Sequence, residues 1–98
     1  MIRHVVMFRW SDEATNDVKE AARQGLAGLA DQVESVRAFV FGDDAGLSEG
    51  NFDTVVVVDF DDEDGYREYA VHPAHVALVT DRLRPFITER SAIQFRLD

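Results

Sequence analysis

Two segments of this chain are apolar on both faces of an extended backbone. Residues 2–10 are rich in β-branched and aromatic side chains, and residues 5–8 in their middle leave no polar face. Residues 53–60 have the same character, because they include four consecutive valines at 55–58. Both segments are therefore predicted to be strands that are buried on two sides.

A helical pattern lies between these segments. Apolar residues recur at spacings of three and four from Val18 to Val33, and Thr15 stands just before them as a plausible N-cap. The pattern predicts one amphipathic helix. Gly25 and Gly28 lie inside it and cost about 1 kcal/mol each relative to alanine, so we expect them to permit close packing against a sheet.

A second helical unit follows the valine-rich segment and is divided by Pro73. The acidic residues 61–64 favour a helix N-terminus, because carboxylates there oppose the positive end of the helix dipole. A short helix carrying Tyr66 and Tyr69 on one side should end before Pro73, which can itself start the next helix. The side chains expected to point inward from that next helix are those of Val76, Val79, Leu83 and Phe86.

Two further strands complete the pattern. Residues 36–41 are strand-like and end at a loop rich in Asp, Gly and Ser, and residues 91–97 alternate between apolar and polar. The order β-α-β-β-α-β predicts an α+β, ferredoxin-like fold with a four-stranded antiparallel sheet and helices on one face. The other face would stay bare, so we expect a homodimer in which two sheets pack face to face. An interface that buries ~800 Å² per chain is typical of a stable dimer.

Length and charge narrow the classes of function. The chain has 98 residues, which predicts a single domain over 1–98, and its 46% hydrophobic content is typical of a folded protein. A net charge of −9 opposes binding to nucleic acid or to anionic membranes. The sequence contains no cysteine, so it cannot form disulfides or thiolate metal sites. It also shows no signal-peptide pattern and no long apolar segment, so we expect a soluble, cytoplasmic protein.

Several segments together carry a family resemblance. The opening segment 2–8, the strand that ends at Phe60, the pentapeptide at 72–76 and the triplet at 83–85 resemble the stress-responsive α/β-barrel domain proteins, the Dabb family. The resemblance covers essentially the whole chain. It implies a dimeric α+β barrel formed when two sheets join face to face, and it does not imply one activity.

The resemblance also implies catalytic candidates. In a plant cyclase of the family, the second histidine of the pentapeptide is the proposed base and a tyrosine six residues earlier assists it; the matching residues here are His75 and Tyr69. An imidazole titrates near working pH and suits general base catalysis. The alternative for each is structural: a helix-start histidine bonded locally, and a core tyrosine with its hydroxyl at the rim.

Four other residues are predicted to bind the ligand. His4 matches a strand histidine of the cyclase, and Phe8 lies on the same side of that strand. Leu26 stands where the cyclase has a pocket tyrosine, and Thr54 where it has a second histidine. For His4, a hydrogen-bonded structural role is the alternative.

Metal and cofactor sites are not predicted. His72 and His75 have a spacing that could place two ligands on one helix face, but Pro73 lies between them, so His72 is expected to cap the helix. The acidic residues at 43–49 and 59–64 match no EF-hand and are explained by solvation and helix capping. No phosphate-binding loop or nucleophile elbow is present in the sequence.

The sequence leads to one main hypothesis and two alternatives. The main one is a dimeric barrel whose cavity, between the sheet and the helices of each chain, binds a small hydrophobic or polyketide-like molecule. It would catalyse a cofactor-free cyclisation or isomerisation with His75 as base. The alternatives are a cofactor-free monooxygenase of the same barrel type and a non-catalytic, stress-responsive structural or interaction protein.

Overall fold

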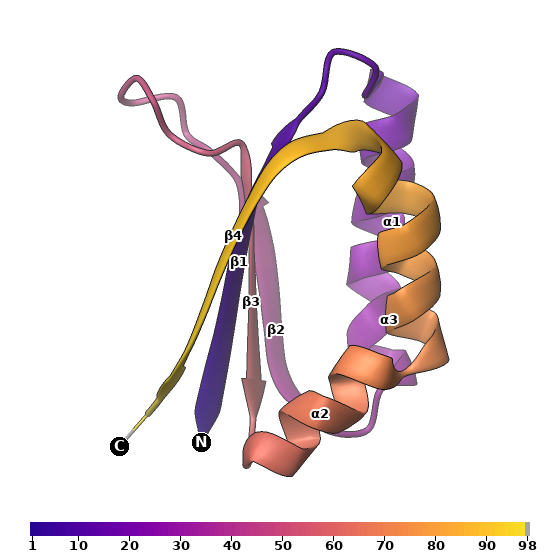
Figure 1. The fold of residues 1–98 in the computed structure, drawn as a ribbon, viewed down its shortest axis with the longest axis vertical. Coiled ribbons are helices and arrows are strands. Elements are labelled where there is room, and N and C mark those ends of the chain that lie inside the picture. The colour runs from indigo at the N-terminus through magenta and orange to yellow at the C-terminus, as the bar shows by residue number, and fades with distance from the viewer. Residues whose placement is uncertain (98) are drawn as a thin grey trace.

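The protein is built as a sheet covered by helices on one side, as the computed structural model, which describes residues 1–97, shows (Figure 1). The strands, in the spatial order β2-β3-β1-β4, are all antiparallel to their neighbours. The ferredoxin-like α+β fold is confirmed. Its elements are β1 (Ile2–Trp10), α1 (Asn16–Gln32), β2 (Val36–Asp43), β3 (Thr54–Phe60), α2 (Glu63–Val71), α3 (Pro73–Leu78) and β4 (Ile87–Arg96).

Helix α1 supplies most of the helical side of the core. Its N-cap is Thr15, as predicted, whose hydroxyl accepts a hydrogen bond from the backbone N–H of Val18 at 3.3 Å. The side chains of Ala22, Leu26 and Leu29 are buried in the core between α1 and the sheet. Burial of each leucine contributes about 1.5–3 kcal/mol, so the amphipathic stripe fixes which side of α1 faces the sheet.

The two glycines of α1 differ in their surroundings. A Cβ on Gly25 would stand 2.5 Å from Cδ1 of Leu78, so this glycine allows α1 to approach α3. A Cβ on Gly28 would meet only the Gln32 amide, at 3.5 Å. The prediction that both glycines pack closely against a sheet is therefore wrong: Gly25 faces another helix, and Gly28 faces a surface side chain.

The second helical unit is divided at Pro73, as predicted. His72 ends α2 and caps α3, because its Nδ1 accepts a hydrogen bond from the backbone N–H of Ala74 at 3.1 Å. A π-helical turn (Val79–Leu83) and a 3-10 turn (Arg84–Phe86) then lead into β4.

The π-helical turn changes which side chains face inward. Leu83 is buried as predicted, and Leu78 is buried as well, whereas Val76 is 46% exposed. The prediction of Val76 as an inward residue is wrong because the wider turn replaces the regular 3.6-residue spacing on which it rested. In this turn the N–H of Arg84 donates to the carbonyl of Val79, five residues earlier.

The sheet face opposite the helices is bare and largely apolar. The register places Val57 and Ile93 on either side of Val5 on this face. Val40 on β2 and Ile93 are 63% and 60% exposed, and Figure 1 shows every helix on the other side of the sheet. Strands β1 and β3 are thus apolar on both faces, as predicted, but one face is open in the single chain.

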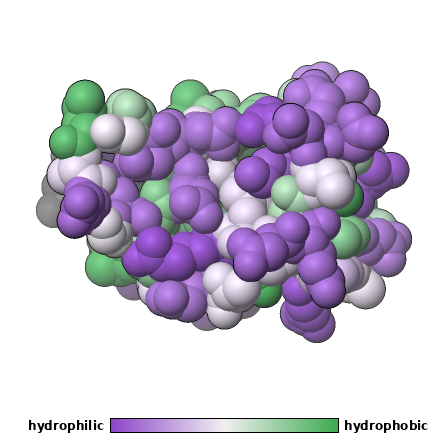
Figure 2. All heavy atoms as spheres, turned by 90° about the horizontal axis from the view of Figure 1, so that it is seen from above, coloured by the Kyte–Doolittle hydropathy of each residue, from purple (hydrophilic) through white to green (hydrophobic). Residues whose placement is uncertain are grey.

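Apolar side chains are also exposed away from this face, among them Leu47 at 89% and Val71 at 75%. The view from above shows mostly hydrophilic residues over this end of the molecule, with hydrophobic residues gathered toward its edges (Figure 2). Among residues 1–97, no helix is long and apolar enough to cross a membrane.

Candidate functional site

A cavity of about 400 Å³ lies between the sheet and the helices, where the sequence predicted one. Its walls are mainly apolar and include Val6, Val56, Leu78 and Leu83. Five of the six predicted site residues line it, and they come from β1, α1, α2 and α3: His4, Phe8, Leu26, Tyr69 and His75. A cavity of this volume is within the range of small-molecule sites.

His75 is held at the cavity wall by its own helical unit. Its Nδ1 lies 3.2 Å from the backbone carbonyl oxygen of Ala70. Because a carbonyl can only accept, Nδ1 carries the proton and the lone pair is on Nε2. Burial lowers the pKa of His75, and the Ala70 hydrogen bond partly opposes this shift. The imidazole is thus neutral at pH 7, with one nitrogen free to accept a proton.

His4 has the opposite arrangement of its ring nitrogens. The side-chain amide nitrogen of Gln94 lies 2.8 Å from its Nδ1, so Nδ1 accepts and the proton is on Nε2. Burial lowers the pKa of His4 to about 4, with a smaller contribution from the positive charge of Arg90. His4 is therefore a neutral hydrogen-bond donor at pH 7.

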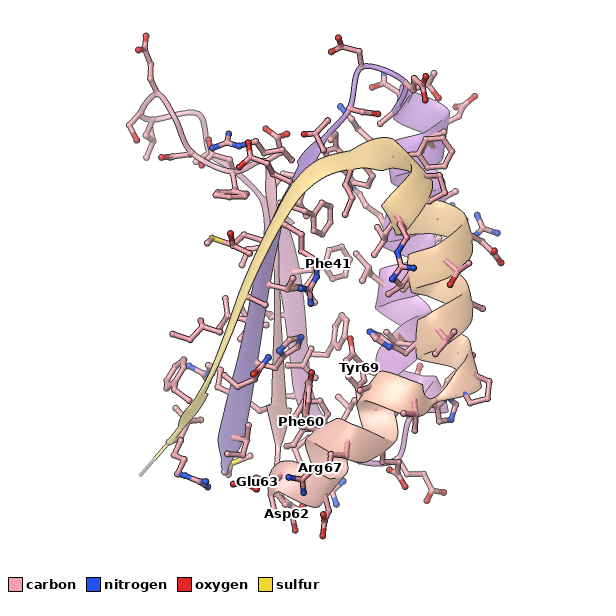
Figure 3. The ribbon with its side chains drawn as sticks, in the orientation of Figure 1. Phe41, Phe60, Asp62, Glu63, Arg67 and Tyr69 are labelled. Atoms are coloured by element: carbon pink, nitrogen blue, oxygen red, sulfur yellow. The ribbon has the colours of Figure 1, made fainter. Side chains whose placement is uncertain are left out.

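Tyr69 stands between the two histidines. Its ring centroid is 4.2 Å from that of His75 and 6.3 Å from that of His4, and it points from α2 into the space between the layers (Figure 3). Burial raises the pKa of its hydroxyl above the ordinary value of 10.0, so the phenol stays protonated. The three side chains together offer one base and two neutral donors.

Thr54 is the predicted ligand-binding residue that does not join this group. Its hydroxyl accepts from Nε1 of Trp10 at 3.1 Å and donates to the carboxylate of Asp43 at 2.9 Å. Its side chain is buried in this local network. Among the described residues 1–97, it is not one of those that line the cavity. The correspondence with the cyclase histidine thus does not carry Thr54 into the cavity.

Two arginines that the sequence analysis did not name as site residues also line the cavity. Arg84 follows the π-helical turn, and Arg90 lies on β4 opposite Phe8 in the register. The expected strand began at residue 91, whereas β4 begins at Ile87, so Arg90 was placed outside any element. Arg90 could have been found only by extending the predicted strand toward the N-terminus, before residue 91.

The polar groups outside the cavity have structural roles. The ring of His72 is used in capping α3, so its Nδ1 is engaged by the backbone rather than paired with His75. At the other helix start, the carboxylate of Asp62 accepts from the N–H of Gly65 at 2.9 Å, as the capping explanation predicted. Figure 3 places Asp62, Glu63 and Arg67 together at the lower end of the molecule, away from the labelled Tyr69.

Known proteins share both the sequence pattern and the fold. Residues 2–97 match the family model of the Stress responsive A/B Barrel Domain, Dabb. The stress-response A/B barrel domain-containing protein HS1 of Arabidopsis thaliana is 26% identical over 81 residues, which are 81% of this chain and 74% of that protein. Olivetolic acid cyclase of Cannabis sativa is 25% identical over 77 residues, 76% of each chain. A dimeric ferredoxin-like protein of unknown function from Thermobifida fusca is 41% identical, with a TM-score of 0.91 over 98% of this chain and 90% of that one.

Proposed function

The chain belongs to the stress-responsive A/B barrel (Dabb) family, and from this premise we propose that it is a homodimeric barrel whose cavity binds a small hydrophobic or polyketide-like molecule. The observation that carries the proposal is the convergence of His75, Tyr69 and His4 on one apolar cavity of about 400 Å³. These residues come from segments far apart in the sequence and line one cavity whose volume suits a small molecule.

The proposed chemistry is proton abstraction beside a carbonyl group. Nε2 of His75 takes a proton from the carbon next to the carbonyl, and the resulting enolate oxygen accepts a hydrogen bond from the Tyr69 hydroxyl. Return of the proton to a different carbon completes an isomerisation. Attack of the enolate carbon on a second carbonyl of the same molecule, with the proton passing to the new alkoxide, completes a cyclisation. Neither route requires a redox change.

The states of the three side chains at pH 7 support this assignment. A neutral His75 is the active form of a base, and a protonated Tyr69 is the active form of a donor. The resemblance to a cyclase supports the same two residues, since the matching positions of that relative are a histidine and a tyrosine. The sequence departs from the relative at Leu26 and at Thr54, so the substrate need not be the same.

A homodimer is proposed through the bare sheet face. Its exposed apolar side chains, Val40 and Ile93 among them, would be covered by the same face of a second copy. The similar protein from Thermobifida fusca is described as dimeric, which supports this arrangement. The cavity lies on the helical side of each sheet, so each chain would keep its own site.

Exchange of carbon-bound protons tests the catalytic part of the proposal. The wild-type protein should accelerate deuterium exchange at the carbon next to the carbonyl of a simple cyclic ketone, followed by NMR, and His75→Gln should lower that rate by about 10²-fold or more. His72→Asn is the matched control, because asparagine also caps helices and position 72 lies outside the cavity lining. Equal rates for wild type and His75→Gln would contradict the assignment of His75 as base.

One observation favours the non-catalytic alternative. The ring of His75 is packed against Tyr69 and bonded to Ala70, as a structural histidine would be. A thermal-shift screen with aromatic polyketides, β-diketones and fatty acids separates the cases, because a ligand at 100 times its Kd adds about 2.7 kcal/mol of stability. Stabilisation without exchange activity would leave a binding protein, and the absence of both would favour a structural role.

A further inference from the structure

The charge of the cavity differs in sign from that of the whole protein. The chain carries 19 acidic and 10 basic residues. None of the residues that line the cavity is acidic, and its formally charged side chains are Arg84 and Arg90. A predominantly acidic protein therefore has a cavity whose fixed charges are positive.

The two cavity arginines also differ from most of the other arginines in their partners. Six arginines form ion pairs with carboxylates at 4.0 Å or less: Arg3, Arg9, Arg23, Arg37, Arg67 and Arg96. Within the described residues, Arg82, Arg84 and Arg90 have no such partner, although carboxylates outnumber basic groups. Of these three arginines, only Arg84 and Arg90 line the cavity. Both side chains are exposed, so they stand where the cavity meets solvent.

Two unrelated features of the fold bring these arginines to the cavity. Arg90 is on the inward face of β4, because it pairs with the buried Phe8 of β1. The π-helical hydrogen bond from the N–H of Arg84 to the carbonyl of Val79 places these two residues one above the other, and both line the cavity. A regular helix would have placed Leu83 above Val79 instead.

From this arrangement we infer that the ligand is a small organic acid, with an apolar body inside the cavity and a carboxylate that binds Arg90, assisted by Arg84. A guanidinium group presents its donors as a planar fork that matches a carboxylate, and it has no other acidic partner here. The apolar walls formed by Val6, Val56 and Leu83 would hold the body of the molecule. This inference rests on the proposed ligand-binding function and adds the charge of the ligand to it.

The placement of the charge also orders the ligand relative to the catalytic candidates. Arg90 lines the same cavity as His4 and His75, and it is exposed at the mouth of that cavity. A carboxylate on Arg90 would thus lie at the open end, with the body of the acid directed past the histidines toward the apolar walls. In a substrate of this class the reacting carbonyl belongs to the body, not to the carboxylate.

A matched pair of probes tests the inference: 4-butylbenzoate and 4-butylbenzamide, which have nearly the same shape and differ in charge. Dissociation constants are measured by NMR titration at fixed, low salt. We expect wild type to bind the benzoate about tenfold more tightly than the amide, as two solvent-facing arginines together would give at low salt. Arg90→Gln should reduce this preference to less than about threefold without changing the Kd of the amide, and Arg84→Gln should reduce it partly.

Arg82→Gln is the control, because Arg82 is near in sequence but does not line this cavity; it should keep the wild-type preference. The unchanged Kd of the amide in each variant shows that the cavity is still folded. Equal affinities of the two probes for wild type would overturn the inference and leave the proposed ligand-binding function standing. A preference that persists in the Arg84→Gln, Arg90→Gln double variant would also overturn it. Failure of both probes to bind would count against both proposals.

Discussion

Acidification should destabilise this protein through His4 before its carboxylates begin to titrate. The His4 side chain is buried and its pKa is lowered from 6.5 to about 4. The unfolded chain, in which the pKa returns to 6.5, therefore binds more protons than the folded one between these two values. Stability is complete above pH 6.5 and is lost as the pH falls toward 4. From these two pKa values, the loss between pH 7 and pH 5 is about 2 kcal/mol.

Urea unfolding at pH 7, 6, 5.5 and 5, at one protein concentration, measures this loss. With a slope of about 1 to 2 kcal/mol per molar for a chain of this size, the midpoint should fall by about 1 to 2 M over the series. His75 contributes a loss in the same direction, because its pKa is also lowered. The range ends at pH 5 so that the carboxylates, whose ordinary pKa values are near 4, stay mostly ionised in both states.

His4→Asn separates the contribution of His4 from the rest. Asparagine places an oxygen near the position of Nδ1, so it can still accept from Gln94, but it does not titrate. The variant should lose most of the pH dependence and keep only the part due to His75. If wild type and His4→Asn lose stability in parallel from pH 7 to 5, the buried, neutral state of His4 is not the cause and the reasoning fails.

Three further predictions follow from packing. Gly28→Ala should raise the free energy of unfolding by about 0.5 to 1 kcal/mol, because alanine favours the helix and its Cβ meets no close atom. Gly25→Ala should lose this gain, because its Cβ would push Leu78 toward the cavity. Chemical denaturation measures the stability of both variants, and ligand titration measures the effect on the cavity. An equal gain at both glycines would contradict the close approach of α1 to α3. Thr15→Ala should lower stability by about 1 kcal/mol through loss of the N-cap hydrogen bond, and Thr15→Asn should not; a neutral Thr15→Ala would show that the cap contributes nothing. Val57→Lys, on the bare sheet face, should convert the proposed dimer into a monomer in light scattering, and a wild-type protein that is already monomeric at micromolar concentration would refute the dimer.

The sequence by itself determined the order of the main helices and strands and the points at which helices are capped or broken, because these depend on interactions within a few residues. The N-cap at Thr15 and the helix break before Pro73 both follow from local hydrogen bonding and backbone geometry, and both are observed. The two-sided apolar pattern of β1 and β3 likewise determined the central strands. The family resemblance added His75 and Tyr69 as partners, which the structure brings to 4.2 Å between ring centroids.

Only the tertiary structure decided the charge of the cavity and the states of its histidines. Arg90 lines the cavity beside His4 and His75 because β4 pairs with β1, a contact between residues some eighty positions apart that no local pattern encodes. The same pairing supplies Gln94 to Nδ1 of His4 and so sets which nitrogen carries the proton. Thr54 shows the converse, since its neighbours Trp10 and Asp43 hold it in a separate network. Short-range interactions fix where helices are capped and broken, whereas strand pairing and burial fix how far a strand extends, which side chains meet and how they are charged.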